Sequence, residues 1–165
     1  MIELVLPYPI SANRYWASRV VTPKGGGRPM AVTYVTPEAK AYREQVAWIA
    51  RGAGVRVPLK GRIRLHAELY PHRPLDWQKR MRKLGECWDD SVQCIDLGNA
   101  EKVMSDALQG IVFADDCMYR RIVLDRCEPD DKGERLVVHI EQIALKHEQA
   151  ALLTPDLIAE AEVPF

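Results

Sequence analysis

The alternation of apolar and polar residues from 62 to 70 is the feature that most constrains the fold. Its apolar members are Ile63, Leu65, Ala67 and Leu69, and charged or polar residues lie between them. Successive side chains on a strand point to opposite faces of a sheet, so this pattern predicts a strand buried on one side only. The other side would carry a polar surface.

Apart from a weak strand at 31–35, the predicted elements follow one another in the order βαβαββ. We expect further strands at 2–6, 31–35, 118–126 and 135–143, and helices at 37–51 and 97–109. The first helix has the clearest signals, because Thr36 can cap it, Pro37 suits its first position, and apolar residues then recur at helical spacing. This order predicts an α+β fold, in which helices pack on one face of a mixed sheet.

Length and composition indicate one compact domain. A chain of 165 residues, 47% of them hydrophobic, can bury one ordinary core but not two. We expect the domain at 1–143, with a basic excursion at 71–93, and a C-terminal tail at 144–165. Because 23 Lys and Arg balance 23 Asp and Glu, the net charge indicates no polyanionic partner, and any nucleic-acid surface must be local.

The sequence shows neither a membrane-spanning segment nor the cysteine spacing of a metal site. No apolar run approaches the roughly 18 to 20 residues of a membrane span, and the N-terminus lacks the basic start of a signal peptide. Four cysteines without metal-site spacing are expected to be reduced thiols: Cys87, Cys94, Cys117 and Cys127. We therefore expect a cytoplasmic protein, nucleoid-associated or phage-encoded, with no membrane partner.

Acidic residues flank the second predicted helix. Asp96 precedes it, Asp115 and Asp116 follow it, and Lys102 lies between them. A hairpin through Gly110 would bring the later acids beside Asp96. Converging carboxylates repel one another unless a divalent cation neutralises them, and Mg²⁺ prefers oxygen ligands. A lysine one turn away could then stabilise negative charge on a phosphate.

Simpler roles for the same residues are also open. Asp96 could cap the helix, and Asp115-Asp116 could form a solvated turn. Lys102 and Asp106 are four residues apart on one helix face, together with Asn99, and could form an exposed ion pair.

The residues around this helix resemble the RusA family of Holliday junction resolvases. Residues 96–102 read Asp-Leu-Gly-Asn-Ala-Glu-Lys and are similar to the family's D-L-D-N-x-x-K element. Asp106-Ala107-Leu108 and Asp115-Asp116 resemble its D-A-L and D-D elements, in the same order. Residues 6–15 are similar to the family's L-P-x-P-P-S-x-N opening, and 36–43 resemble its first helix. The resemblance covers about residues 1–143.

This resemblance implies an activity and a set of site residues. The activity would be Mg²⁺-dependent cleavage of four-way DNA junctions by a homodimer in recombination and repair, with Mn²⁺ as an alternative metal. Asp96 and Asp116 match metal-binding, catalytic acids, Lys102 matches the catalytic lysine, and Asp115 is the acid beside the second ligand.

Gly98 departs from the family pattern, because a second aspartate usually stands there. Three explanations are open: Glu101, one turn along the same face, supplies an oxygen to the metal; Asp89 or Asp90 does so; or the protein binds junctions and cuts them poorly. A general metal-dependent nuclease could use the same acids.

Two further segments are candidate DNA contacts. Asn13 and Arg14 match loop positions near the family's active site. The basic excursion could grip phosphates, with Trp77 and Trp88 stacking on bases, or it could simply be a solvated basic helix. Its candidate contacts are Arg73, Lys79, Arg80, Arg82 and Lys83.

The last six residues, 160–165, carry acids followed by Val-Pro-Phe. They resemble the tip by which bacterial single-stranded-DNA-binding proteins recruit repair enzymes. This pattern suggests a host repair protein as a partner, and a structural terminus is the alternative.

Overall fold

A four-stranded mixed sheet forms the centre of the computed structural model, which describes residues 1–144. Its strands are β1 (Ile2–Pro7), β4 (Ile63–Tyr70), β5 (Tyr119–Arg126) and β6 (Arg135–Gln142). They lie in the order β1-β6-β4-β5, with β6 antiparallel to β1 and β4, and β5 parallel to β4. The predicted α+β class is confirmed. The motif at 160–165, proposed to bind a repair protein, lies outside the described residues.

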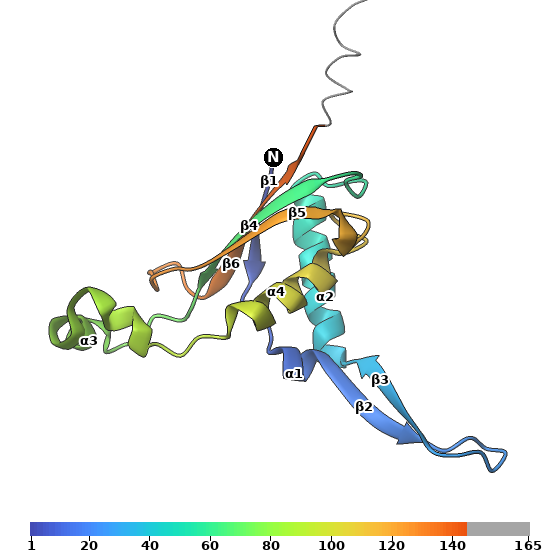
Figure 1. Ribbon diagram of the computed structural model, residues 1–165. Coiled ribbons are helices and arrows are strands. Elements are labelled where there is room, and N and C mark those ends of the chain that lie inside the picture. The colour runs from blue at the N-terminus through green and yellow to red at the C-terminus, as the bar shows by residue number, and fades with distance from the viewer. Residues whose placement is uncertain (145–165) are drawn as a thin grey trace, which may run out of the picture.

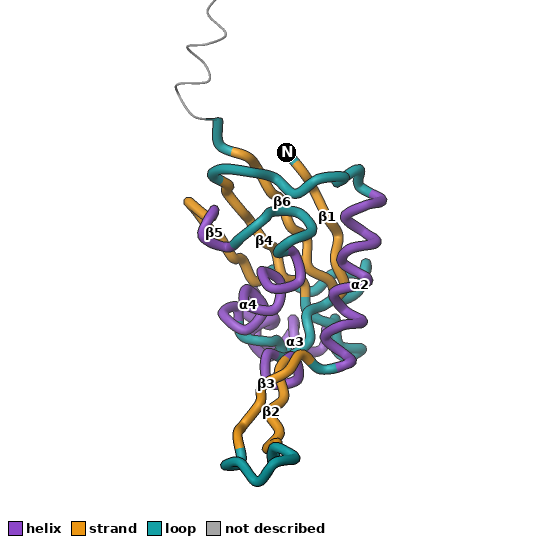
Figure 2. Tube along the Cα trace, turned by 90° about the vertical axis from the view of Figure 1, so that its right-hand side faces the viewer, coloured by secondary structure: helices purple, strands orange, loops and turns teal. Residues whose placement is uncertain are grey.

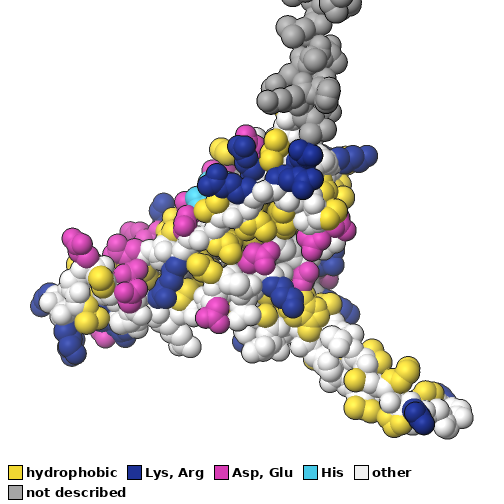
Figure 3. All heavy atoms as spheres, in the orientation of Figure 1, with side chains coloured by type: hydrophobic (Ala, Val, Ile, Leu, Met, Phe, Trp, Pro, Cys, Tyr) yellow, Lys and Arg dark blue, Asp and Glu magenta, His cyan; other side chains and the backbone are white. Residues whose placement is uncertain are grey.

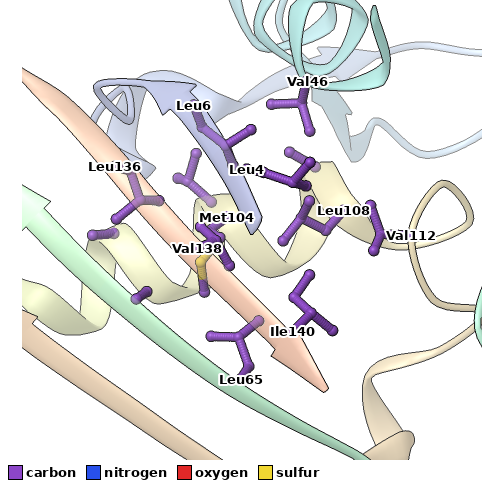
Figure 4. Packing of buried hydrophobic residues seen from close by; sticks show 14 of the residues in the cluster. Leu4, Leu6, Val46, Leu65, Met104, Leu108, Val112, Leu136, Val138 and Ile140 are labelled. Carbon is purple, nitrogen blue, oxygen red and sulfur yellow. The ribbon is translucent and has the colours of Figure 1, made fainter. Parts of the chain in front are cut away.

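One face of this sheet is buried, as the alternation in β4 predicted. Leu65 pairs with Ile140, and Val138 lies between Ala67 and Leu4, so apolar side chains of three strands share one face. Helices α2 (Pro37–Gly52) and α4 (Leu97–Leu108) cover that face (Figures 1 and 4). On the other face of β4, Arg64 is exposed and His66 is half-buried.

Helix α2 begins as its sequence predicts. The Thr36 side chain accepts a hydrogen bond from the backbone N–H of Ala39 at 3.2 Å, and Pro37 occupies the first turn. Such a cap contributes about 1 kcal/mol. The hydroxyl of Tyr42 donates to the carbonyl of Pro7 at 3.2 Å, which ties the buried face of the helix to the end of β1.

Two segments project from this body (Figure 1). After the short helix α1 (Ala12–Tyr15), strands β2 (Trp16–Val21) and β3 (Met30–Val35) form a hairpin that points away from the sheet. The sequence predicted β3 and missed α1 and β2. The second projection holds α3 (Trp77–Leu84) and the 3₁₀ segment η1 (Gly85–Ser91). Within the described chain, every helix is too short or too polar to cross a bilayer.

The basic excursion is therefore an ordered element. Trp88 is 1% exposed, and its indole N–H donates to Glu128 at 2.8 Å. Arg126 donates to the carbonyls of Asp89 and Val92, which fastens η1 to the end of β5. Trp88 is thus a packing residue, and the idea that it stacks on DNA bases is wrong, because its ring is not accessible.

Candidate active site

The first candidate residue, Asp96, stands at the N-terminus of α4. Its backbone is extended, and its carbonyl accepts the N–H of Ala100 at 2.9 Å. Its carboxylate makes no capping bond to the helix; instead it accepts from the Asn99 amide at 3.2 Å. Asp96 therefore occupies the cap position while one carboxylate oxygen stays available for another partner.

Asp96 opens into a cavity of about 830 Å³. Asn99 lies on the same wall, and Asn13 and Arg14 of α1 line the cavity as well. Arg14 also forms an ion pair at 2.7 Å with Glu38, in the first turn of α2, and this contact restrains its guanidinium. The structure thus brings the N-terminal loop candidates to the same hollow as Asp96.

A second acidic group lies further along α4. Burial raises the pKa of Asp106, and the nearby charges of Asp116 and Glu101 raise it further, while Lys102 and Arg43 oppose the shift. Like charges disfavour one another's ionised forms, so these three carboxylates are close enough to interact. The group would bind a cation or a proton more readily than an isolated acid.

Neighbouring hydroxyls support this group from the core side. Ser105 donates to Glu101 at 2.8 Å, and its oxygen is 3.0 Å from the hydroxyl of Tyr119. Burial raises the pKa of Tyr119, and the acids Glu101, Asp116 and Asp106 add to that effect. Tyr119 is therefore a neutral hydroxyl at physiological pH, and it helps to fix the direction of the Glu101 carboxylate.

Asp115 and Asp116 differ in their surroundings. The Asp115 carboxylate accepts the backbone N–H of Cys117 at 3.0 Å and caps the short 3₁₀ turn η2 (Asp116–Met118). This hydrogen bond holds the pKa of Asp115 below its usual value. Asp116 is exposed and faces the acids of α4. The solvated-turn reading fits Asp115, whereas Asp116 belongs to the acidic group.

Lys102 lies over an aromatic ring rather than in an ion pair. Its ammonium is 4.6 Å from the centroid of the Trp16 ring, and no Lys102–Asp106 salt bridge forms among the described residues. Its charge still lowers the pKa of Asp106, so it lies near the acidic group. Trp16 thus contacts the Lys102 ammonium, a pairing that no local sequence pattern indicated.

The sequence suggested that two or three carboxylates converge, and a convergence of three is not formed in the described residues. Within residues 1–144, no three His, Cys, Asp or Glu side chains are placed to hold a metal together. The reason is the length of α4: Asp96 and Asp106 are ten residues apart, about 15 Å along a helix, and Asp116 interacts with the later part.

The donor set nevertheless fits Mg²⁺. This ion is usually held by one or two carboxylates, with water and substrate phosphates completing its octahedral shell. Exposed Asp96 and Asp116 offer hard oxygen donors, and Glu101 lies on α4 between Asp96 and Asp106. A protein cage of three or more ligands is therefore not required.

The basic candidates of the excursion have different environments. Arg80 donates to Asp76 at 2.9 Å and to the carbonyl of Ser91 at 2.9 Å, so it holds α3 against η1 although it lines the large cavity. Arg73 stacks over Trp77, 4.9 Å from the ring centroid. The remaining three are exposed on α3: Lys79, Arg82 and Lys83.

Comparison with known protein families gives a match over most of the chain. The sequence model of the family described as endodeoxyribonuclease RusA matches residues 7–141, which include every candidate residue above. No curated protein matches the sequence significantly.

Proposed function

Because the chain belongs to the RusA endodeoxyribonuclease family, whose members act on Holliday junctions, we propose that it resolves four-way DNA junctions by Mg²⁺-dependent hydrolysis in recombination and repair. The observation that supports this proposal best is the arrangement along α4. Carboxylates lie at its start and beside its later turns. Between them lies the Lys102 ammonium, which contacts the ring of Trp16.

In the proposed reaction, one or two carboxylates hold the metal, and water and the substrate phosphate complete its shell; the candidate ligands are Asp96, Asp116 and Glu101. Bound Mg²⁺ would supply a Lewis acid for the phosphate and would make a coordinated water more acidic. Lys102, held on Trp16, offsets the negative charge that develops on the phosphate oxygens. Asn13 and Arg14 line the cavity beside Asp96 and would contact the DNA backbone there.

We further propose that the active form is a homodimer. Resolution of a four-way junction requires two nicks in opposed strands, and a pair of identical sites related by a two-fold axis supplies both. Host repair proteins as partners of the C-terminal residues stay a prediction from the sequence.

The glycine at position 98 bears on how the metal is held. A Cβ built on Gly98 meets no atom within 4 Å, so the space that an aspartate would occupy is open. Glu101 follows one turn later and belongs to the same acidic group as Asp116. We infer that Glu101 supplies the oxygen that Gly98 cannot. A junction-binding protein with weak catalysis is the second candidate, and the missing carboxylate at Gly98 is what favours it.

One assay tests these alternatives. Full-length protein is incubated with labelled four-way junction, linear duplex and RNA, each with Mg²⁺ and with EDTA. The proposal expects paired nicks in the junction with Mg²⁺ only. Tight junction binding without nicks would establish the binding protein, and equal cleavage of all substrates would establish a general nuclease.

A further inference from the structure

The β2–β3 hairpin exposes side chains that a folded domain normally buries. Val20 is 71% exposed, Met30 59% and Tyr34 43%. Figures 1 and 2 show the hairpin extending from the body without covering another element. Scattered apolar residues on a surface need no explanation, but a projecting ribbon with apolar residues on both strands is available for a contact.

The hairpin also carries charge of one sign only. From residue 16 to 36 the sequence has three basic residues and no acid, although the whole chain has zero net charge. These residues are Arg19, Lys24 and Arg28. All three are exposed, and none forms an ion pair with the part of the chain that the structure describes. Figure 3 accordingly shows no acidic side chains on this projection.

The shape of the hairpin is that of a two-stranded ribbon. Its six residue pairs, from Trp16↔Val35 to Val21↔Met30, give paired strands about 20 Å long. At the tip, the N–H of Gly26 donates to the carbonyl of Pro23 at 3.3 Å, and Gly26 has a φ of 80°. Lys24 lies within this turn and Arg28 follows it, so both basic residues belong to the loop that joins the two strands. The major groove of DNA accepts a two-stranded β-ribbon.

The base of the hairpin adjoins the candidate site. Trp16, the first residue of β2, carries the Lys102 ammonium on its ring. Thr36, just after β3, donates its hydroxyl to the carbonyl of Arg14 at 2.7 Å. The ribbon therefore starts beside the proposed catalytic lysine and leads outward from it.

We propose that the β2–β3 hairpin is a DNA-binding arm that lies in a groove of the duplex entering the active site. Lys24 and Arg28 contact phosphates on either side of the groove, and the apolar side chains of the strands pack against sugars and base edges. Its basic charge and its continuity with the site favour DNA over a second copy of the chain, whose surface is neutral overall. The inference rests on the proposed function, since it takes DNA as the substrate.

The first test compares two double variants of the full chain. Lys24→Ala with Arg28→Ala removes both tip charges, and Arg51→Ala with Arg56→Ala removes two exposed charges at the far end of α2. Each lost phosphate contact lowers the slope of log affinity against log salt by about 0.9 on duplex DNA, so the tip variant should lose about 1.8 per engaged arm. The α2 variant should keep the wild-type slope. Equal slopes for all three proteins would overturn the proposal.

A second variant tests the tip loop and the rival occupant. Replacing residues 22–29 by Asn-Gly shortens the arm at its last pair and provides a favourable hairpin turn. Junction affinity and oligomeric state are measured together. Weaker DNA binding at an unchanged oligomeric state supports the arm. Loss of dimers with unchanged DNA affinity would show a contact between copies and overturn it.

These measurements separate the arm from the cleavage proposal. Wild-type protein that binds duplex through the tip but does not cut junctions would refute the proposed function and leave the arm standing. If the wild-type protein and the tip variant cut junctions equally well, and their DNA affinities depend on salt with the same slope, the arm alone is refuted.

Discussion

Restoring an aspartate at position 98 is the sharpest test of how the site holds its metal. Gly98 is the second residue of α4, is exposed, and has open space around the position of a Cβ. Gly98→Asp therefore introduces a carboxylate without a clash. The change replaces a poor helix former and adds an acid to the first turn, which favours the fold by a few tenths to about 1 kcal/mol.

Repulsion from a neighbouring acid opposes that gain. Glu101 lies three residues after the new aspartate on the same helix face, and like charges at such spacing destabilise a helix by a few tenths of a kcal/mol. Without metal, we expect the free energy of unfolding to stay within about 1 kcal/mol of the parent value. The melting temperature should then shift by no more than about 4 °C in EDTA.

The effect on the metal should be larger. Unit charges 4 Å apart attract by about 1 kcal/mol in water and about 4 kcal/mol near a protein surface, and the exposure of Gly98 selects the lower part of this range. An added carboxylate should therefore strengthen Mg²⁺ binding by about 1.4 kcal/mol, which is about tenfold. The Mg²⁺ concentration for half-maximal junction cleavage should fall by that factor.

Gly98→Asn is the matched control, because it has the same shape and no charge. Cleavage is measured across a Mg²⁺ titration for both variants, alone and combined with Glu101→Gln. We expect Glu101→Gln to raise the Mg²⁺ requirement of the parent and to have little effect beside Asp at position 98. If Gly98→Asp and Gly98→Asn gave the same titration and Glu101→Gln had no effect, no metal would be held at this turn.

Four other substitutions probe the site. Asp96→Asn and Asp116→Asn should abolish cleavage and leave junction binding intact or stronger, since each removes repulsion toward phosphate; full Mg²⁺-dependent cleavage by either would remove that acid from the site. Lys102→Ala should slow cleavage by orders of magnitude but change stability by only about 1 kcal/mol, the value of an exposed cation–π contact with Trp16; normal turnover would refute its role. Burial raises the pKa of Asp106, so the folded state favours the protonated side chain. This contribution to the free energy of unfolding is lost as pH rises. Asp106→Asn should therefore be the more stable protein at pH 7 in EDTA, with an advantage that shrinks toward pH 4; denaturant melts at both pH values check this.

The fold was predictable where burial differs between the two sides of an element. Leu65 and Leu69 alternate with polar residues because one face of β4 packs on helices, and the helical spacing in α2 has the same origin. Strand β2 was missed for the opposite reason. Both faces of the hairpin meet solvent over most of its length, so its sequence carries no alternation of buried and exposed positions.

The excursion shows a second limit of local patterns. Its run of basic residues suggested a DNA-contacting segment or a solvated basic helix, and the α3 helix has no buried residue. Its order comes from Trp88, whose partner Glu128 lies after β5, and from Arg126, which holds η1. Contacts between residues so far apart in the chain cannot be read from spacing.

The same limit explains why the catalytic candidate Lys102 was only partly understood from sequence. Its spacing from Asp106 suggested an exposed ion pair, yet the ammonium lies on the ring of Trp16, which local spacing does not connect with α4. The difference matters chemically. A lysine paired with a carboxylate presents little net charge to a phosphate, whereas an aromatic face holds the ammonium in place and leaves its full charge in front. Of these two arrangements, the contact with Trp16 is thus the one that suits the proposed stabilisation of a phosphoryl transition state.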